Sequence, residues 1–180
     1  MIKFLMAISG PAILNLNPLS WWISILTMSN ITSNTKISLM ALSGASLEEG
    51  IKDLQNQLTE LQQASEGEGK SSAGDKYETG REIINQSREV LKKQLVGLEI
   101  MKYQLKTIPI KPSIMVEEGA ILQLEMGYIW VAVSLGKVEL ESTAIQVVSK
   151  DSPLLAALWG LKKGETGVFR GKNYQVLEIF

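Results

Sequence analysis

The chain has 180 residues, of which 45% are hydrophobic and 21% charged, which is typical of a globular protein with one domain or two small ones. It contains no His and no Cys, which excludes disulfides, thiolate metal sites, cysteine nucleophiles and histidine-based acid–base or metal chemistry. A formal net charge of -1, from 18 bases and 19 acids, indicates neither a basic field for nucleic acid nor an acidic disordered chain.

The acidic residues are distributed unevenly along the chain. All 19 lie at or beyond Glu48, whereas the residues before it carry only the cations Lys3 and Lys36. The first quarter of the chain and the remainder are therefore different kinds of sequence.

Residues 1–45 form an apolar leader. Breaks at Gly10-Pro11 and at Asn15 to Pro18, with no small-residue cleavage pattern, disfavour a signal peptide and a spanning helix of roughly 20 apolar residues. Three interpretations remain: an extension upstream of the working protein, whose true start is Met28 or Met40; a membrane or export segment within residues 1–28; or a packed part of the fold. Asn30 to Asn34 is interpreted as a linker.

A first helix is predicted to begin at Ser46. Ser46-Leu47-Glu48-Glu49 has the capping-box pattern, in which the hydroxyl and the second glutamate satisfy orphan backbone N–H groups. A narrow leucine-rich seam at alternating spacings of four and three follows, which favours packing along one partner helix. Its members are Leu47, Ile51, Leu54, Leu58 and Leu61. The glycines and serines from Ala64 to Gly74 then predict a turn.

A second helix is predicted from about Gly74 to about Lys106. Tyr77, Ile84, Leu91, Leu98 and Leu105 recur every seven residues. Two heptad seams joined by a short loop predict an antiparallel helical hairpin over residues 46–107. The alternative is a pair of core helices packed on the C-terminal region. The first helix is the shorter one, so the hairpin is either short or recruits residues from Lys36 to Leu42.

Residues 108–180 are predicted to form a small antiparallel sheet with one helix. Pro109 and Pro112 end the long helix, and short apolar runs punctuated by glycines follow. The expected strands are 120–124, 128–134, 138–140, 144–148, 167–169 and 174–179. Asp151 or Ser152 caps a helix over 154–161, with Pro153 at its first position. The fold class is therefore α+β, with a helical hairpin followed by a small sheet region.

Two stretches resemble the GreA/GreB family of transcription elongation factors. The first is Ser152-Pro153-Leu154-Leu155-Ala156-Ala157-Leu158-Trp159-Gly160-Leu161-Lys162-Lys163-Gly164-Glu165, with the closing strand Tyr174-Gln175-Val176-Leu177-Glu178-Ile179. The second, from Glu68 to Arg81, is similar to the loop and second-helix start of short Gre-like proteins. The resemblance covers about Ser46 to Phe180 and leaves the leader unexplained.

The resemblance implies an antiparallel coiled coil followed by a C-terminal domain of FKBP-like fold. It implies a cytoplasmic accessory factor, not an enzyme, that binds RNA polymerase near its secondary channel and contacts nascent RNA and DNA only indirectly. Carboxylates at the coiled-coil tip would help to hold a Mg²⁺ in the polymerase active site, which carries out any cleavage of backtracked RNA. The chain would have no metal of its own, no tightly bound cofactor and no small-molecule substrate.

The polymerase-binding residues implied by the motif are Ser152, Pro153, Leu154, Lys162 and Lys163. The alternative interpretation is structural: Pro153 and Leu154 begin and pack the helix, and the lysines are ordinary surface charges. Leu155 stands where the family has Gly, and Leu161 stands where it has Lys.

The candidate tip carboxylates are Glu66, Glu68 and Asp75. When the chain is aligned on Tyr77, Lys70 and Ala73 stand where the family places its two tip acids. Asp75 also suits a helix cap, and the two glutamates also suit a solvated loop.

Two other function classes fit the sequence. One is a membrane-tethered or exported coiled-coil interaction protein, with membrane contact only if residues 1–28 are an anchor. The other is a helical-hairpin adaptor that oligomerises through its seam.

Overall fold

The computed structural model describes the backbone of residues 33–68 and 74–180, and their side chains except at 33, 65–68, 74–79 and 81. These residues belong to one compact unit of the chain, Thr32–Phe180. The interpretations of the leader before residue 33 fall outside the described residues. Within the described part, no helix is both long and apolar enough to cross a bilayer.

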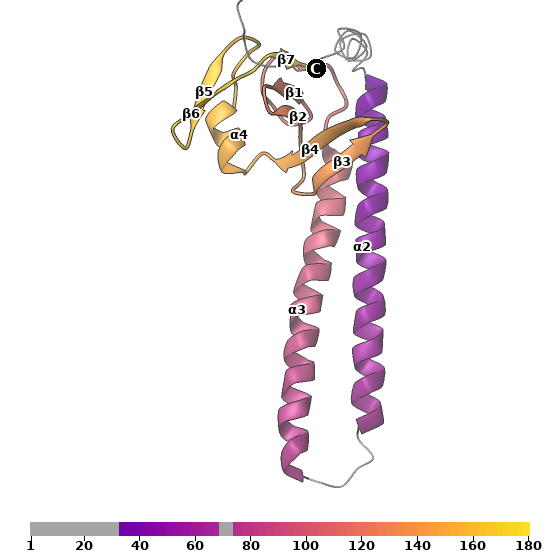
Figure 1. Cartoon of the computed structure of the whole chain (residues 1–180). Coiled ribbons are helices and arrows are strands. Elements are labelled where there is room, and N and C mark those ends of the chain that lie inside the picture. Colours follow the sequence, from indigo (N-terminus) through magenta and orange to yellow (C-terminus); the bar gives the residue numbers. More distant parts are fainter. Residues whose placement is uncertain (1–32, 69–73) are drawn as a thin grey trace, which may run out of the picture. The chain divides into compact units, whose positions relative to one another are not determined.

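Two long helices form the predicted antiparallel hairpin. Helix α2 spans Ser33–Glu68 and helix α3 spans Gly74–Thr107, and the two pack along one another (Figure 1). The bounds of α3 confirm the helix predicted from the heptad repeat.

The predicted start of the first helix at Ser46 was wrong, because α2 begins at Ser33 and Ser46 lies in its interior. The linker interpretation was likewise wrong at Ser33 and Asn34. Buried positions at helical spacing continue the inner face upstream through Leu39 and Ser43, both 0% exposed. Tertiary packing of this face outweighs the local capping signal. The alternative in which the hairpin recruits residues from Lys36 to Leu42 is the correct one.

Burial of the hairpin seam is uneven. Leu47 is 1% exposed and Leu105 is 2% exposed, whereas Leu54, Leu58 and Leu61 are only partly buried. The buried positions lie in the half of α2 that also contacts strand β3 of the sheet region. In the far half, among the described residues, α3 is the element that packs along α2.

The C-terminal region contains seven strands and one short helix. In chain order these are β1 (Ile121–Leu124), β2 (Gly127–Ala132), β3 (Gly136–Leu140), β4 (Thr143–Ser149), α4 (Pro153–Leu158), β5 (Thr166–Phe169), β6 (Lys172–Gln175) and β7 (Glu178–Ile179). Five strands form one sheet in the order β3-β4-β2-β1-β7, and β5 pairs with β6 in a separate two-stranded ribbon. The α+β arrangement is the predicted one: a helical hairpin followed by a small, mostly antiparallel sheet with one helix.

One strand pair departs from the antiparallel expectation. Strand β4 runs parallel to β2, from Tyr128 opposite Ile145 to Ala132 opposite Ser149. Strands β3 and β4 form an antiparallel hairpin, and β4 inserts between β3 and β2. Because β3 reverses the chain and β4 reverses it again, β4 must run in the direction of β2.

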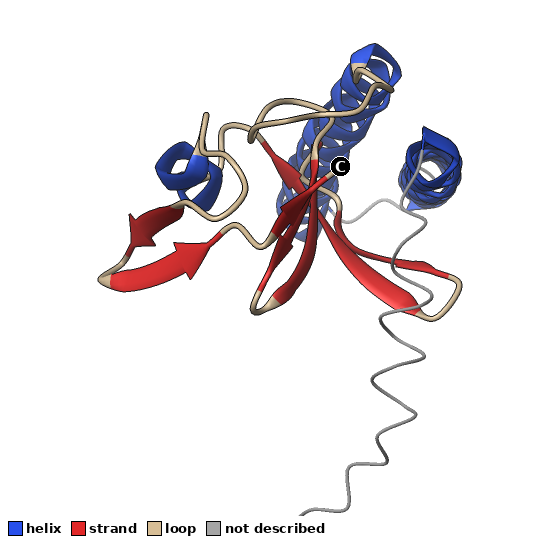
Figure 2. Ribbon diagram, turned by 90° about the horizontal axis from the view of Figure 1, so that it is seen from above, coloured by secondary structure: helices blue, strands red, loops and turns tan. Residues whose placement is uncertain are grey.

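Helix α4 covers one face of the larger sheet. Leu155 and Leu158, both 0% exposed, pack in a core cluster with Leu122, Val131 and Val176. Figure 2 shows α4 and the β5–β6 ribbon to one side of the larger sheet and the long helices to the other. The core thus anchors α4, whose ends carry the residues singled out by the sequence motif.

Candidate functional site

The start of α4 is built by the motif residues Ser152 and Pro153. The Ser152 hydroxyl accepts a hydrogen bond from the backbone N–H of Leu155 at 3.2 Å, and Pro153 occupies the first helical turn. Both roles follow from local chemistry, since a hydroxyl satisfies an orphan donor and proline has no donor to leave unsatisfied. Leu154 is partly buried and packs against the core cluster.

A segment before the sheet runs beside the turn that follows α4. Helix α4 ends at Leu158 with Trp159 as its C-cap, and Gly160 follows at φ +76°. The N–H of Gly160 donates to the carbonyl of Val116 at 2.9 Å, and the N–H of Val116 donates to the carbonyl of Leu161 at 2.8 Å. An antiparallel bridge then places Met115 directly opposite Lys162. Directly opposed residues project from the same face of a sheet, so these two side chains are neighbours.

The two motif lysines have different surroundings. The Lys163 ammonium pairs with the Glu178 carboxylate of β7. Lys162 is exposed, and its side chain forms no ion pair with a described residue. Its backbone N–H donates to the Glu165 carboxylate at 2.8 Å, and its carbonyl accepts from the N–H of Glu165 at 3.1 Å. The ammonium of Lys162 is therefore available to a partner, whereas that of Lys163 is engaged within the fold.

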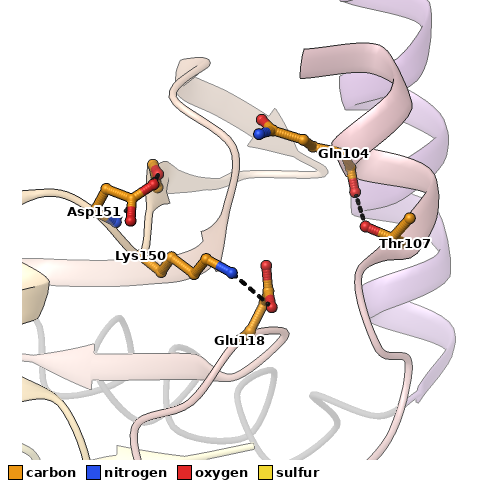
Figure 3. Close-up of polar contacts among 6 residues, drawn as sticks. Gln104, Thr107, Glu118, Lys150 and Asp151 are labelled. Atoms are coloured by element: carbon orange, nitrogen blue, oxygen red, sulfur yellow. Dashed lines mark hydrogen bonds and ion pairs between the residues drawn. The ribbon is translucent and has the colours of Figure 1, made fainter. Parts of the chain in front are cut away.

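The loop that leads into α4 is tied to the segment before β1. The Lys150 ammonium lies 3.4 Å from the Glu118 carboxylate, and the two side chains point toward one another (Figure 3). Next to it, the Asp151 N–H donates to the Ser149 hydroxyl at 3.2 Å. These contacts are solvent-exposed, so they orient the loop more than they stabilise it.

The structure therefore brings the five sequence-predicted binding residues to the two ends of one short helix. Ser152, Pro153 and Leu154 lie at its beginning, and Lys162 and Lys163 lie just beyond its end. Their contact with a partner stays a prediction, since the structural roles of Ser152, Pro153 and Leu154 account for the motif as well.

Exposed apolar side chains near this helix were missed by the sequence analysis. Ile114 is 78% exposed, Trp159 is 47% exposed and Met115 is 38% exposed. Trp159 directly follows α4, and Met115 pairs with Lys162. The apolar run after Pro112 was a detectable signal, because no predicted strand accounted for it.

The candidate tip carboxylates occupy the far end of the hairpin. Glu66 and Glu68 belong to the last turn of α2, and Asp75 belongs to the first turn of α3. Their side chains lie outside the described residues. Among the described side chains, no group of three or more acidic residues is arranged to hold a metal ion.

Comparisons with known proteins gave matches only among solved structures. No family model matches the chain, and no curated protein matches it. The chain is similar to GreA factor homolog 1 of Thermus thermophilus, with 17% identity over 77% of this chain and 95% of that one, and a TM-score of 0.32. A second structure, described as that of the transcription factor Gfh1, gives 17% identity, 77% and 93% coverage, and a TM-score of 0.32. The Thermus aquaticus protein gives 19% identity, 76% and 94% coverage, and a TM-score of 0.29.

Proposed function

We propose that this chain is a Gre-type transcription factor that binds RNA polymerase through the surface at the end of α4. The observation that carries the proposal is local. The stretch that resembles the GreA/GreB signature forms a capped helix and a turn, beyond which Lys162 presents an exposed ammonium beside Met115. A cation next to an apolar side chain suits a protein partner that offers a carboxylate beside an apolar residue.

The long hairpin supports the same proposal. Helices of 36 and 34 residues give a rod of about 50 Å at 1.5 Å per residue, which is long enough to reach into a channel of a large partner. In the proposed complex, the α4 surface binds at the rim of the secondary channel and the hairpin enters it. The near-neutral net charge of -1 suits a factor that recognises protein before nucleic acid.

In this proposal the chain is an accessory factor and contributes no metal of its own. Any Mg²⁺ and any cleavage of RNA belong to the polymerase active site. Carboxylates such as Glu66 and Glu68 are of the chemical type that Mg²⁺ accepts beside its waters. If the tip carboxylates help to hold that Mg²⁺, the factor rescues backtracked elongation complexes. If they do not, it pauses elongation complexes.

The decisive experiment is co-purification with core RNA polymerase. We expect wild type to bind and K162E to bind about tenfold more weakly, which corresponds to about 1.4 kcal/mol. K172E is the matched control, because Lys172 is an exposed lysine on β6 outside the motif. Equal binding by K162E and wild type would remove this surface from the interface, and wild type recovered on membranes without polymerase would overturn the function.

Lys163 needs a different design because it pairs with Glu178. K163E alone places two carboxylates together, so the double variant K163E/E178K restores the pair with its charges exchanged. If Lys163 itself contacts the polymerase, the exchanged pair stays defective in binding; if it only supports the fold, binding recovers. A backtracked complex that contains the E66A/E68A variant then reports whether the tip affects cleavage.

A further inference from the structure

Lys36 is a buried cation in the first part of α2. Its side chain is 2% exposed, and its ammonium donates a hydrogen bond to the backbone carbonyl of Lys111 at 2.5 Å. Burial lowers the pKa of Lys36 to about 8, with the Glu117 carboxylate opposing this effect and the Lys111 ammonium adding to it. The Glu117 carboxylate is itself paired with the Lys111 ammonium at 3.2 Å. Among the described residues, no carboxylate forms an ion pair with Lys36.

A buried cation of this kind works against stability. Replacing buried charged groups by apolar residues of similar volume is often neutral or stabilising. The best-attested benefit of a costly buried polar group between helices is that it selects one register. In this hairpin, a residue that selects the register has a role, because the apolar seams permit more than one.

The apolar seams do not by themselves select the pairing of α2 with α3. Leu47, Leu54 and Leu61 recur every seven residues on α2, and Leu91, Leu98 and Leu105 do so on α3. A shift by one heptad would still pair leucine with leucine. The connecting stretch is rich in glycine and serine, so its sequence tolerates more than one turn position.

The contacts of α2 with α3, and with the segment that directly follows α3, fit one antiparallel register. Lys36 meets Lys111, Glu48 pairs with Lys102 at 2.8 Å, and a methyl placed on Gly50 would lie 3.1 Å from Leu98. The Glu48–Lys102 pair is largely exposed and contributes little. A shift of α2 by one heptad toward the tip would carry the Lys36 ammonium alongside Leu105, among helix carbonyls that already accept helix bonds.

We propose that Lys36 is a positioning residue that selects the register of the hairpin through its contact with the Lys111 carbonyl. A shift by one heptad relocates the turn by three to four residues, which moves the tip by about 5 Å. The position of the tip is thus set at the opposite end of the hairpin. This inference concerns the hairpin alone and needs no polymerase, so its failure is distinguishable from failure of the proposed function.

The test uses the absence of cysteine in the natural chain. Cysteines introduced by T59C and K92C lie on the same side of the hairpin, where both residues line one groove between α2 and α3, and both positions are exposed. Nitroxide labels at these sites should show strong dipolar broadening in the full chain and in K36R, which keeps a cationic donor. In K36M we expect a second population of spins with weaker broadening, because a shift by seven residues moves the labels apart by about 10 Å along the helix axis. K52M, which removes an exposed lysine on the same helix, should match wild type.

Each other outcome contradicts the proposal. A single broadened population in K36M would show that the seam selects the register without Lys36. A second population in K52M to the same extent would show a nonspecific effect of losing a cation from α2. Failure of K36M to fold, judged by circular dichroism, would also overturn it, because the charge would then stabilise the hairpin instead of selecting its register.

Discussion

At the scale of single residues, some polar groups stabilise the local fold, whereas others select one arrangement of the helices over another. Ser152 is of the first kind, since its hydroxyl satisfies a backbone donor at the start of α4. Its role was predictable because cap and helix are adjacent in sequence. Lys36 is of the second kind, and nothing in its neighbourhood along the chain indicated that it would be buried.

Because burial lowers the pKa of Lys36, the free energy of unfolding should depend on pH in the range where Lys36 titrates. Its pKa is about 8 in the fold and 10.5 in the unfolded chain, so at pH 7 the burial of the charge destabilises the fold by about 3 kcal/mol. Between pH 8 and 10.5 the unfolded state binds more protons, so the free energy of unfolding rises with pH in this window. We expect the wild type to gain about 2 kcal/mol relative to K36M between pH 7 and pH 10.

The measurement is urea denaturation of both proteins at the two pH values. Taking the difference between the proteins cancels the other lysines and tyrosines that titrate in alkali. K36M should also be the more stable protein at pH 7. A difference that does not change with pH would mean that Lys36 keeps an ordinary pKa in the fold.

At the scale of elements, period and punctuation in the sequence predicted most of the structure. The heptad repeat of α3, the strands around Ile129 and Val147, and the helix after Ser152 were all identified. The predicted start of the first helix lies too far along the chain, because Ser46 and Glu49 have the pattern of a good local cap. Non-local packing of Leu39 and Ser43 decided otherwise. The bridge from Met115 to Lys162 joins residues far apart in sequence, which no local pattern reveals.

Alanine substitutions at two glycines are expected to have opposite effects on stability. A methyl on Gly167 of β5 would overlap the Ala157 carbonyl oxygen and lie 2.7 Å from the Leu158 side chain. A methyl on Gly97 of α3 would meet nothing within 4 Å. We expect G167A to destabilise the protein by about 1–3 kcal/mol through overpacking, and G97A to stabilise it by about 0.5–1 kcal/mol through helix propensity.

Chemical denaturation of the two variants against wild type measures both effects. The variants make the same substitution, so they control for one another. If G167A were as stable as wild type, the β5–β6 ribbon would have to move away from α4 without a loss of unfolding free energy. The ribbon would then support the candidate binding surface less than its contacts with α4 indicate.

At the scale of the whole molecule, the described sheet region packs against the hairpin through β3, near the end at which α2 begins, and the two stabilise one another there. Leu39 on α2 is 0% exposed in the half that contacts β3, whereas Leu61 near the far end is partly buried. We expect L39A to cost about 2–5 kcal/mol of unfolding free energy, and L61A about 1 kcal/mol.

Thermal and urea unfolding of the two leucine variants test this gradient, and amide hydrogen exchange locates it. Exchange should be slower in the part of α2 around Leu39 than around Leu61, since local opening of the far half exposes less apolar surface. Equal costs for the two substitutions would mean that the seam alone stabilises the hairpin along its whole length.

The sequence by itself determined the order of the parts: a leader without acids, two heptad helices, and short strands around one capped helix. These features follow from local periodicity and from the chemistry of proline, glycine and serine. Only the tertiary structure decided that α2 begins at Ser33, that β4 runs parallel to β2, and that Lys162 is available while Lys163 is paired. Each of these depends on residues distant in sequence, whose contacts outweigh local preference once the chain is compact.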